Sequence, residues 1–223
     1  MKLFSALKYY LSSIPTLLAG VNFYSIPLMF LDGKMLLKTS AGINFYVREL
    51  IEIWTIKEVV LDRQYEDHRQ LRPGDVVIDI GAAIGEFSIH AAKTAKTVYG
   101  FEIVDESIER MRNNMEINNC TNINLIQQGV ESLNDIFSEN SIDHCDFLKV
   151  DCEGCEYHIF KDVADEVLDK IDYMALEVHF FNDDMISAYK ELTERLADKF
   201  NLIETPSPVH SNIAFLYAIR KNT

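Results

Sequence analysis

The chain reads Val76-Val77-Ile78-Asp79-Ile80-Gly81-Ala82-Ala83-Ile84-Gly85 between residues 76 and 85, and this stretch decides its fold. A short apolar strand runs into a turn that contains glycine, and residues Ile84–Lys93 then have the composition of a helix. Gly81 lets the chain turn tightly at the end of the strand, and Gly85 permits a close approach of helix and strand. This order of strand, glycine turn and helix is typical of the first nucleotide-binding unit of a parallel α/β sheet.

Further apolar runs follow, 20-odd residues apart, with helical patterns between most of them. The expected strands are VVIDI, TVYGF, INLIQ, DFLKV and YMALEV, and the expected helices are Ile84–Lys93, Glu106–Asn118 and Tyr157–Asp169. Continuous apolar strands alternating with helices predict a parallel sheet covered on both faces. Asn201–Glu204 and Asn212–Arg220 have no room for a crossover helix between them, so they should pair antiparallel at one edge. The pattern predicts a doubly wound α/β fold with a mostly parallel seven-stranded sheet and an antiparallel C-terminal hairpin. This is the Rossmann-like arrangement of class I S-adenosylmethionine (SAM)-dependent methyltransferases.

Residues 1–70 are expected to form a cover segment, and residues 71–223 the SAM-binding methyltransferase domain. Met35–Lys38 and Ile43–Val47 flank a Ser-Ala-Gly turn and predict a β-hairpin, while Ile51–Tyr65 predicts a helix. Leu11–Leu31 carries no charge, but it contains two prolines and several polar residues, a poor composition for a helix that crosses a bilayer. We expect a short helical or looped segment here that packs on the domain, with contact to a membrane surface as the minor alternative.

The composition narrows the classes of partner. The chain has 21 Lys and Arg against 35 Asp and Glu, which gives a net charge of −14. Affinity for nucleic acids comes largely from basic residues, so this charge argues against a nucleic-acid partner. The chain shows no convincing secretory signal, so a cytoplasmic location is expected. Four cysteines are too few for a disulfide scaffold, and Cys152 and Cys155 are expected to be buried and reduced rather than bound to a metal.

The turn also indicates which cofactor binds. Asp79 stands where a dinucleotide site has its first glycine, and a carboxylate there would repel a pyrophosphate but suit the ammonium and sulfonium groups of SAM. Glu102 ends the second strand, 21 positions after Gly81, where it can accept hydrogen bonds from both ribose hydroxyls. The expected cofactor-binding residues are Asp79, Gly81, Ala82, Gly85, Glu102, Ile103 against the adenine face, Gly129 and Val130 at its edge, and Asp151.

Acidic residues and one histidine follow the fourth and fifth strands. Lys149, Asp151 and Glu153 alternate onto one face, and Glu177 and His179 share a face of the next strand. Ligands of open parallel sheets bind beyond these strand ends, so the predicted catalytic residues are His179, Asp151, Glu153 and Glu177. His179 is the first candidate for the base and Asp151 the second. No metal site is expected, although the same four side chains could hold a divalent cation. Lys149 is expected to be the structural partner of a nearby carboxylate.

Several stretches resemble the FkbM-type SAM-dependent methyltransferases. They are WTIKEVVLDRQY, VVIDIGAAIGEFSIHAAK, VYGFEI, the asparagines Asn113, Asn114 and Asn118, DFLKVDCEGCE and LEVHF. The resemblance implies methyl transfer to a hydroxyl oxygen of a small molecule, a sugar or a lipid-linked glycan. It also implies that Trp54, Glu58 and Tyr65 cover the site. The chain departs from that family at Ala83, where Asn is usual, and at Cys152 and Cys155, where small apolar residues are usual.

Two other functions stay open. IDIGAAIGEFSIHAAK and VYGFEI also resemble tRNA base methyltransferases, although the fourth strand does not end in the Asn/Asp-Pro-Pro-aromatic loop common in nitrogen methylation. The chain could instead bind SAM without catalysing a reaction. The acids beside His179 favour an enzyme.

Overall fold

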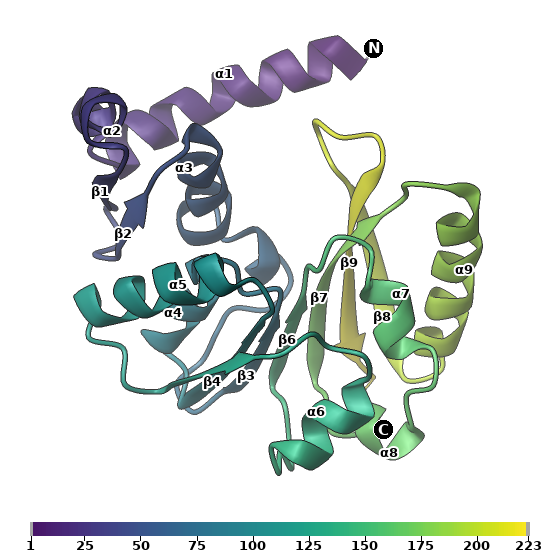
Figure 1. The fold of residues 1–223 in the computed structure, drawn as a ribbon. Helices are drawn as coiled ribbons and strands as arrows, with labels where there is room; N and C mark the ends of the chain where they lie inside the picture. Colours follow the sequence, from purple (N-terminus) through teal and green to yellow (C-terminus); the bar gives the residue numbers. More distant parts are fainter. Residues whose placement is uncertain (1, 222–223) are drawn as a thin grey trace.

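The structure is a computed structural model that describes residues 2–221, and its centre is one twisted sheet (Figure 1). The sheet has seven strands in the order β5-β4-β3-β6-β7-β9-β8. Strands β3 to β7 run parallel, and β9 pairs antiparallel with both β7 and β8. The bounds are β3 Val76–Ile80, β4 Thr97–Glu102, β5 Ile123–Gln127, β6 Phe147–Val150, β7 Tyr173–His179, β8 Phe200–Pro206 and β9 Ile213–Arg220. The predicted class I methyltransferase fold is confirmed.

Helices cover both faces of this sheet (Figure 1). One face carries α4 Glu86–Ala92 and α5 Asp105–Ile117, and the other carries α6 Leu133–Glu139, α7 Glu156–Phe160, α8 Asp165–Leu168 and α9 Asp183–Ala197. Each strand packs against both layers of helices, because its successive side chains point to opposite faces of the sheet. In β6, for example, Phe147 packs in one core and Leu148 in the other.

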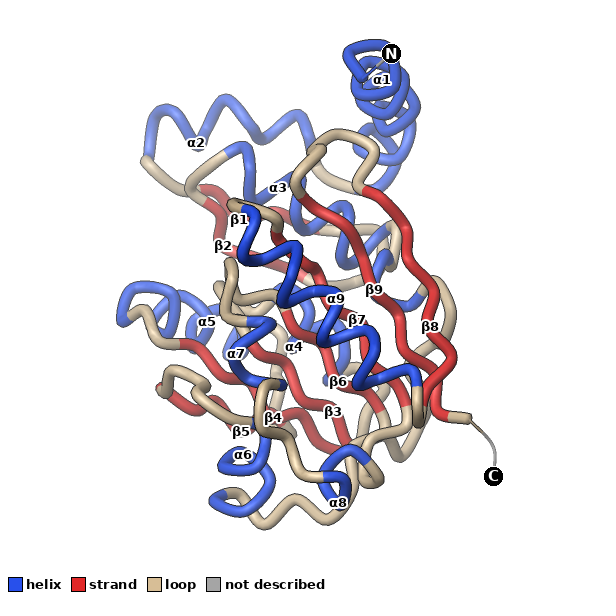
Figure 2. Tube along the Cα trace, turned by 90° about the vertical axis from the view of Figure 1, so that its right-hand side faces the viewer, coloured by secondary structure: helices blue, strands red, loops and turns tan. Residues whose placement is uncertain are grey.

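An N-terminal layer lies over the α4–α5 side of the sheet. It contains α1 Lys2–Gly20, a 3-10 turn Phe23–Ser25, α2 Ile26–Asp32 and the antiparallel hairpin β1 Met35–Lys38 and β2 Asn44–Val47. The hairpin agrees with the sequence prediction. The expected short segment, Leu11–Leu31, contains the second half of the 19-residue α1, the 3-10 turn and most of α2. In Figure 2 α1 is seen nearly end-on, at the edge of the molecule. Many of its apolar side chains are exposed, Leu11 at 57% among them. No helix within the described residues is long and apolar enough to cross a membrane.

Two predicted helices are broken in the structure. Residues 51–65 form α3 Leu50–Ile56, a π-helical turn Lys57–Leu61 and a 3-10 turn Gln64–Glu66, and Arg63 adopts a left-handed conformation between the last two. Residues 157–169 divide into α7 and α8. The cause of this second break is tertiary, because the Asn134 side chain bonds Asp162 O and the amide of Ala164 in the gap.

Candidate active site

The turn after β3 is packed against the end of β6. Gly81 has φ +77°, and a Cβ built on it would lie 1.8 Å from the carbonyl oxygen of Asp151. Both the conformation and the space therefore require glycine. Ala83 also lies in the left-handed region, at φ +47°, which suits Gly or Asn better than alanine. The local backbone therefore explains why Asn is usual at this position in the FkbM-type pattern, and nothing in the structure explains the alanine of this chain.

Asp79 is fully buried beneath this turn rather than free at its rim. Lys149, its neighbour across the β3–β6 register, places Nζ 3.0 Å from Asp79 Oδ1, and Ser88 Oγ donates to Oδ2 at 2.6 Å. Burial raises the pKa of Asp79, and the Lys149 ammonium opposes that rise. Lys149 also donates to Gly81 O at 2.7 Å. The aspartate thus acts with Lys149 as a buried pair that fixes the turn, which gives Lys149 the structural role expected of it.

Glu102 also holds backbone of the cofactor turn. Its Oε1 accepts the amides of Ile103 and Val104 at 2.7 and 2.8 Å, and its Oε2 accepts the amide of Ala83 at 2.8 Å. A carboxylate oxygen has about two lone-pair sites, so Oε2 keeps capacity for a further donor such as a ribose hydroxyl. The strand-end acid therefore joins β4 to the glycine turn and still presents one oxygen to a ligand.

An apolar surface suited to adenine follows Glu102. Ile103 is 66% exposed, an unusual position for so large an apolar side chain at the end of a buried strand. Gly129 lies beside it, where a Cβ would approach Ile103 Cδ1 to 2.9 Å, and Val130 is half-buried next to it. An exposed apolar face, an acid with a free lone pair and a glycine turn fit the adenosine part of SAM. The remaining predicted cofactor residues lie in the same turn region, with Ala82 buried and Gly85 at the start of α4.

A second group of residues meets at the ends of β6 and β7, and we call Asp151, Glu153, Glu177 and His179 the acidic rim. One ligand-type atom from each of Asp151, Glu177 and His179 lies within 4.8 Å of the others. Glu153 Oε2 is 3.6 Å from His179 Nε2. The Gly81 turn touches the backbone of Asp151, so this group adjoins the cofactor turn. The structure thus brings together all four residues that the sequence assigned to catalysis.

Two further side chains contact the rim, and the sequence analysis had not assigned either of them to it. Tyr65 O–H donates to Asp151 Oδ2 at 2.9 Å and lies 3.4 Å from Glu177 Oε2, so it is a rim residue as well as part of the cover. Glu156, fully buried, accepts from His179 Nδ1 at 2.8 Å. Burial and the rim carboxylates raise the pKa of Tyr65, and burial with Asp151 raises the pKa of Glu177 to about 8. The signal for Glu156 was present in the sequence, as the last acid of Asp151-Cys-Glu-Gly-Cys-Glu156.

Trp54 in α3 and Glu58 in the π-helical turn form hydrogen bonds with each other and with α1 rather than with the rim. Trp54 Nε1 donates to Glu58 Oε1 at 2.9 Å, and Tyr9 O–H donates to the same oxygen. Asn114 and Asn118 are likewise structural, because they bond the backbone of the β1–β2 hairpin.

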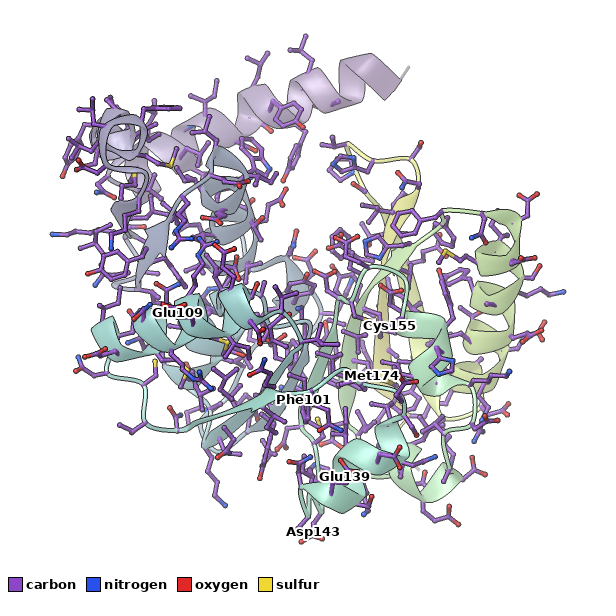
Figure 3. The ribbon with its side chains drawn as sticks, in the orientation of Figure 1. Phe101, Glu109, Glu139, Asp143, Cys155 and Met174 are labelled. Carbon is purple, nitrogen blue, oxygen red and sulfur yellow. A yellow bond between two sulfur atoms is a disulfide. The ribbon has the colours of Figure 1, made fainter. Side chains whose placement is uncertain are left out.

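The expectation of two reduced cysteines is wrong. Cys152 and Cys155, which is labelled in Figure 3 at the start of α7, form a disulfide across the turn that carries Glu153. The turn brings their Cα atoms to 5.4 Å, within the range that a disulfide requires. Cys120 and Cys145 are free, and Cys145 is fully buried.

Comparison with known proteins identifies the family. A family profile described as a methyltransferase domain matches residues 71–182, half of the chain. The chain belongs to this methyltransferase family. Its fold is that of class I SAM-dependent methyltransferases, as the sequence predicted. A structure of a Streptococcus mutans methyltransferase in complex with S-adenosylhomocysteine (SAH) superposes with a TM-score of 0.56 at 14% identity, covering 78% of this chain and 99% of that one. Among curated relatives, an uncharacterized RNA methyltransferase of Listeria innocua is 33% identical over 141 residues, 61% of this chain and 31% of the relative.

A third relative is the 23S rRNA (uracil(1939)-C(5))-methyltransferase RlmD of Aliivibrio fischeri. It is 39% identical over 61 residues, which is 27% of this chain and 14% of that protein. The chain spans about a third of the length of the first curated relative it matches.

These relatives correct two expectations. The predicted hydroxyl acceptor on a small molecule, sugar or lipid-linked glycan is wrong, because the similar curated proteins are named as RNA methyltransferases. The exclusion of a nucleic-acid partner is wrong for the same reason. Its physical basis was weak: net charge describes the whole surface, whereas a substrate meets only part of it.

Proposed function

We propose that this methyltransferase transfers a methyl group from SAM to a base of RNA. The observation that carries the proposal is the 33% identity over 141 residues to a relative named for RNA methylation. A cytoplasmic location is part of the same proposal. We interpret the FkbM-type resemblance of residues 146–156 as a relationship within the class I enzymes that does not determine the acceptor.

The acceptor atom is proposed to be a nitrogen that carries a proton. SAM supplies an electrophilic methyl group, and a ring N–H or exocyclic amine must lose its proton to take it. The acidic rim consists of proton-accepting groups, with His179 and Asp151 as the first and second candidates. Carboxylates also accept hydrogen bonds from base N–H groups.

A carbon acceptor is less well supported by the rim. Methylation at carbon of a pyrimidine uses a nucleophile that adds to the ring, and cysteine thiolate is the most effective one available. Here Cys152 and Cys155 are joined, and burial raises the pKa of both Cys120 and Cys145. None of the four cysteines offers a thiolate at the rim.

The test is to incubate the purified chain with methyl-labelled SAM and separate pools of tRNA and rRNA, then digest the RNA and identify methylated nucleosides by mass spectrometry. We expect an N-methylated nucleoside from one pool.

His179→Gln should lower turnover by about 100-fold or more and leave the SAM affinity within twofold of the wild type. This is the size expected for loss of an acid–base group. Glu102→Ala should weaken SAM binding by about 10-fold or more, since hydrogen bonds to a charged group contribute roughly 1.5–3 kcal/mol.

Glu109→Gln is the matched control, an exposed acid on α5 that is labelled in Figure 3, and it should behave as the wild type. A chain that binds SAM but labels no nucleoside in either pool would contradict the proposal. A methyl group found on a base carbon would overturn the choice of nitrogen.

A further inference from the structure

Together with Glu156, the acidic rim gathers four carboxyl groups, and His179 is their only ion-pair partner within residues 6–221. Glu153, Glu156 and Glu177 all lie within 4 Å of the His179 ring, and Asp151 joins them through Tyr65. Across residues 6–221, no Lys or Arg side chain forms an ion pair with any of these four carboxylates. The nearby Lys149 is paired with Asp79. Carboxylates gathered at this density are stable when a cation lies between them.

His179 is oriented toward this cluster by a buried carboxylate. The ring is 1% exposed, and Nδ1 faces Glu156 Oε1 at 2.8 Å. Its Nε2 is 3.6 Å from Glu153 and 3.7 Å from Glu177, beyond hydrogen-bond distance, and has no hydrogen-bond partner within the described residues. A proton held on Nδ1 by Glu156 leaves the Nε2 lone pair aimed into the cluster. Metal-binding histidines are held in this way, by a carboxylate on the other ring nitrogen.

We propose that Asp151, Glu177 and His179 bind a divalent transition-metal cation of the Mn²⁺ or Zn²⁺ class. Their ligand atoms already lie within 4.8 Å of one another, close to the separation of at most about 4.3 Å that two ligands of one ion can have. An imidazole nitrogen with two carboxylate oxygens suits these cations better than Mg²⁺ or Ca²⁺, which prefer oxygen ligands only. Three protein ligands leave coordination positions open, as in catalytic rather than structural metal sites.

The role of this site rests on the proposed function, although the binding does not. A bound cation offsets the rim carboxylates, so that a polyanionic RNA can approach them. An open coordination position accepts an oxygen of a base or a phosphate. With the cation bound, His179 acts as a ligand, so the role of base passes to the second candidate, Asp151, whose uncoordinated oxygen accepts the proton.

The chain contains a matched control cluster. His144, Asp146 and Asp172 also place ligand atoms within 4.8 Å of one another. There, however, the histidine is exposed, its Nε2 is 3.2 Å from Asp172, and Arg220 lies 3.8 Å from the same aspartate. This second cluster is internally paired and should not hold a cation.

The test measures Mn²⁺ binding to metal-free protein by the loss of the free Mn²⁺ signal in electron paramagnetic resonance. We expect one equivalent bound. Glu177→Gln and His179→Gln should each weaken binding by more than 10-fold, and Glu156→Gln, which removes only the orienting carboxylate, by about 10-fold. Asp172→Asn should leave the affinity within twofold. Circular dichroism checks that each variant folds, and Asp151→Asn replaces any that does not.

Absence of stoichiometric Mn²⁺ or Zn²⁺ binding at millimolar concentration would overturn the inference, as would equal loss of binding in Asp172→Asn. The two proposals fail separately. Mn²⁺ bound by a chain that methylates no RNA contradicts only the proposed function. Full RNA methylation by a chelator-treated chain that binds no Mn²⁺ contradicts only the metal site.

Discussion

At the scale of single residues, Glu86 shows how burial controls ionisation near the cofactor turn. It lies at the first position of α4, 6% exposed, and burial raises the pKa of its carboxyl from 4.5 to about 7. Its own backbone amide and Lys149 act in the opposite direction without cancelling the effect of burial. The folded chain therefore holds a proton on Glu86 over a pH range in which the unfolded chain has lost it.

This residue predicts a pH-dependent loss of stability. A raised pKa in the folded state contributes stability that is complete below pH 4.5 and is lost as the pH rises through 7. Glu86→Gln keeps a neutral side chain, so the variant should be more stable than the wild type at pH 8, by about 3 kcal/mol at roughly 1.4 kcal/mol per pKa unit. Urea unfolding of the SAM-free protein at pH 4.5 and pH 8 measures the difference. An equal difference at the two pH values would show that folding does not shift the pKa of Glu86.

At the scale of elements, two asparagines attach the β1–β2 hairpin to α5. Asn114 is fully buried; its Oδ1 accepts the amide of Tyr46 at 2.8 Å and its Nδ2 donates to Ile84 O at 3.0 Å. Asn118 bonds both backbone groups of Asn44. The hairpin is therefore hydrogen-bonded to α5 through side-chain amides, and its buried side chains pack in the same core as one face of the sheet.

Removal of one amide should weaken that connection. Asn114→Ala leaves a buried N–H and a buried carbonyl without partners, each costing about 1–3 kcal/mol, so we expect a loss of about 2–4 kcal/mol in unfolding free energy. The adjacent Asn113→Ala, at an exposed position, should change stability by less than about 0.5 kcal/mol. Chemical denaturation of both variants measures the contrast. Similar losses in the two would mean that the amide contacts of Asn114 contribute nothing specific.

At the scale of the whole molecule, the distribution of charge restricts how RNA can be held. The net charge is −14, and the basic side chains that share a surface hollow of about 350 Å³ are Lys34, Arg48 and Arg110. Arg48 and Arg110 are already paired with Glu106 and Glu52. Few phosphates can therefore be neutralised at this hollow, and RNA that binds there should gain most of its affinity from contacts that do not depend on salt.

We expect a shallow salt dependence of RNA binding. An upper limit of three phosphate contacts, at about 0.7 each, gives a slope of about −2 in log K against log salt, or roughly a 15- to 20-fold loss of affinity between 50 and 200 mM KCl. Fluorescence anisotropy with labelled RNA measures this slope. Lys34→Gln should make it shallower by about 0.7, the contribution of one phosphate contact. A slope steeper than about −5 would point to a much wider basic interface than this surface provides.

The local sequence pattern was sufficient to predict the fold of the chain. Apolar runs alternating with helical patterns determined the parallel sheet, and the missing crossover after residue 204 determined the antiparallel edge, because these patterns depend on neighbours in the sequence. The same strand pattern predicted that Asp151, Glu153, Glu177 and His179 lie together, since parallel strands end at one edge of the sheet. Net charge and a motif resemblance, in contrast, led to the wrong acceptor class.

Only the tertiary structure decided what each of these groups faces. Asp79 was read as a free acid selecting a cationic ligand, but Lys149 lies beside it across the sheet and the pair is buried. Tyr65 comes from the cover segment to bond Asp151, 86 residues away. The break between α7 and α8 depends on Asn134. Sequence determines the pattern of strands and helices because that pattern is local, whereas the partner of a buried polar group is set by which distant segments pack against it.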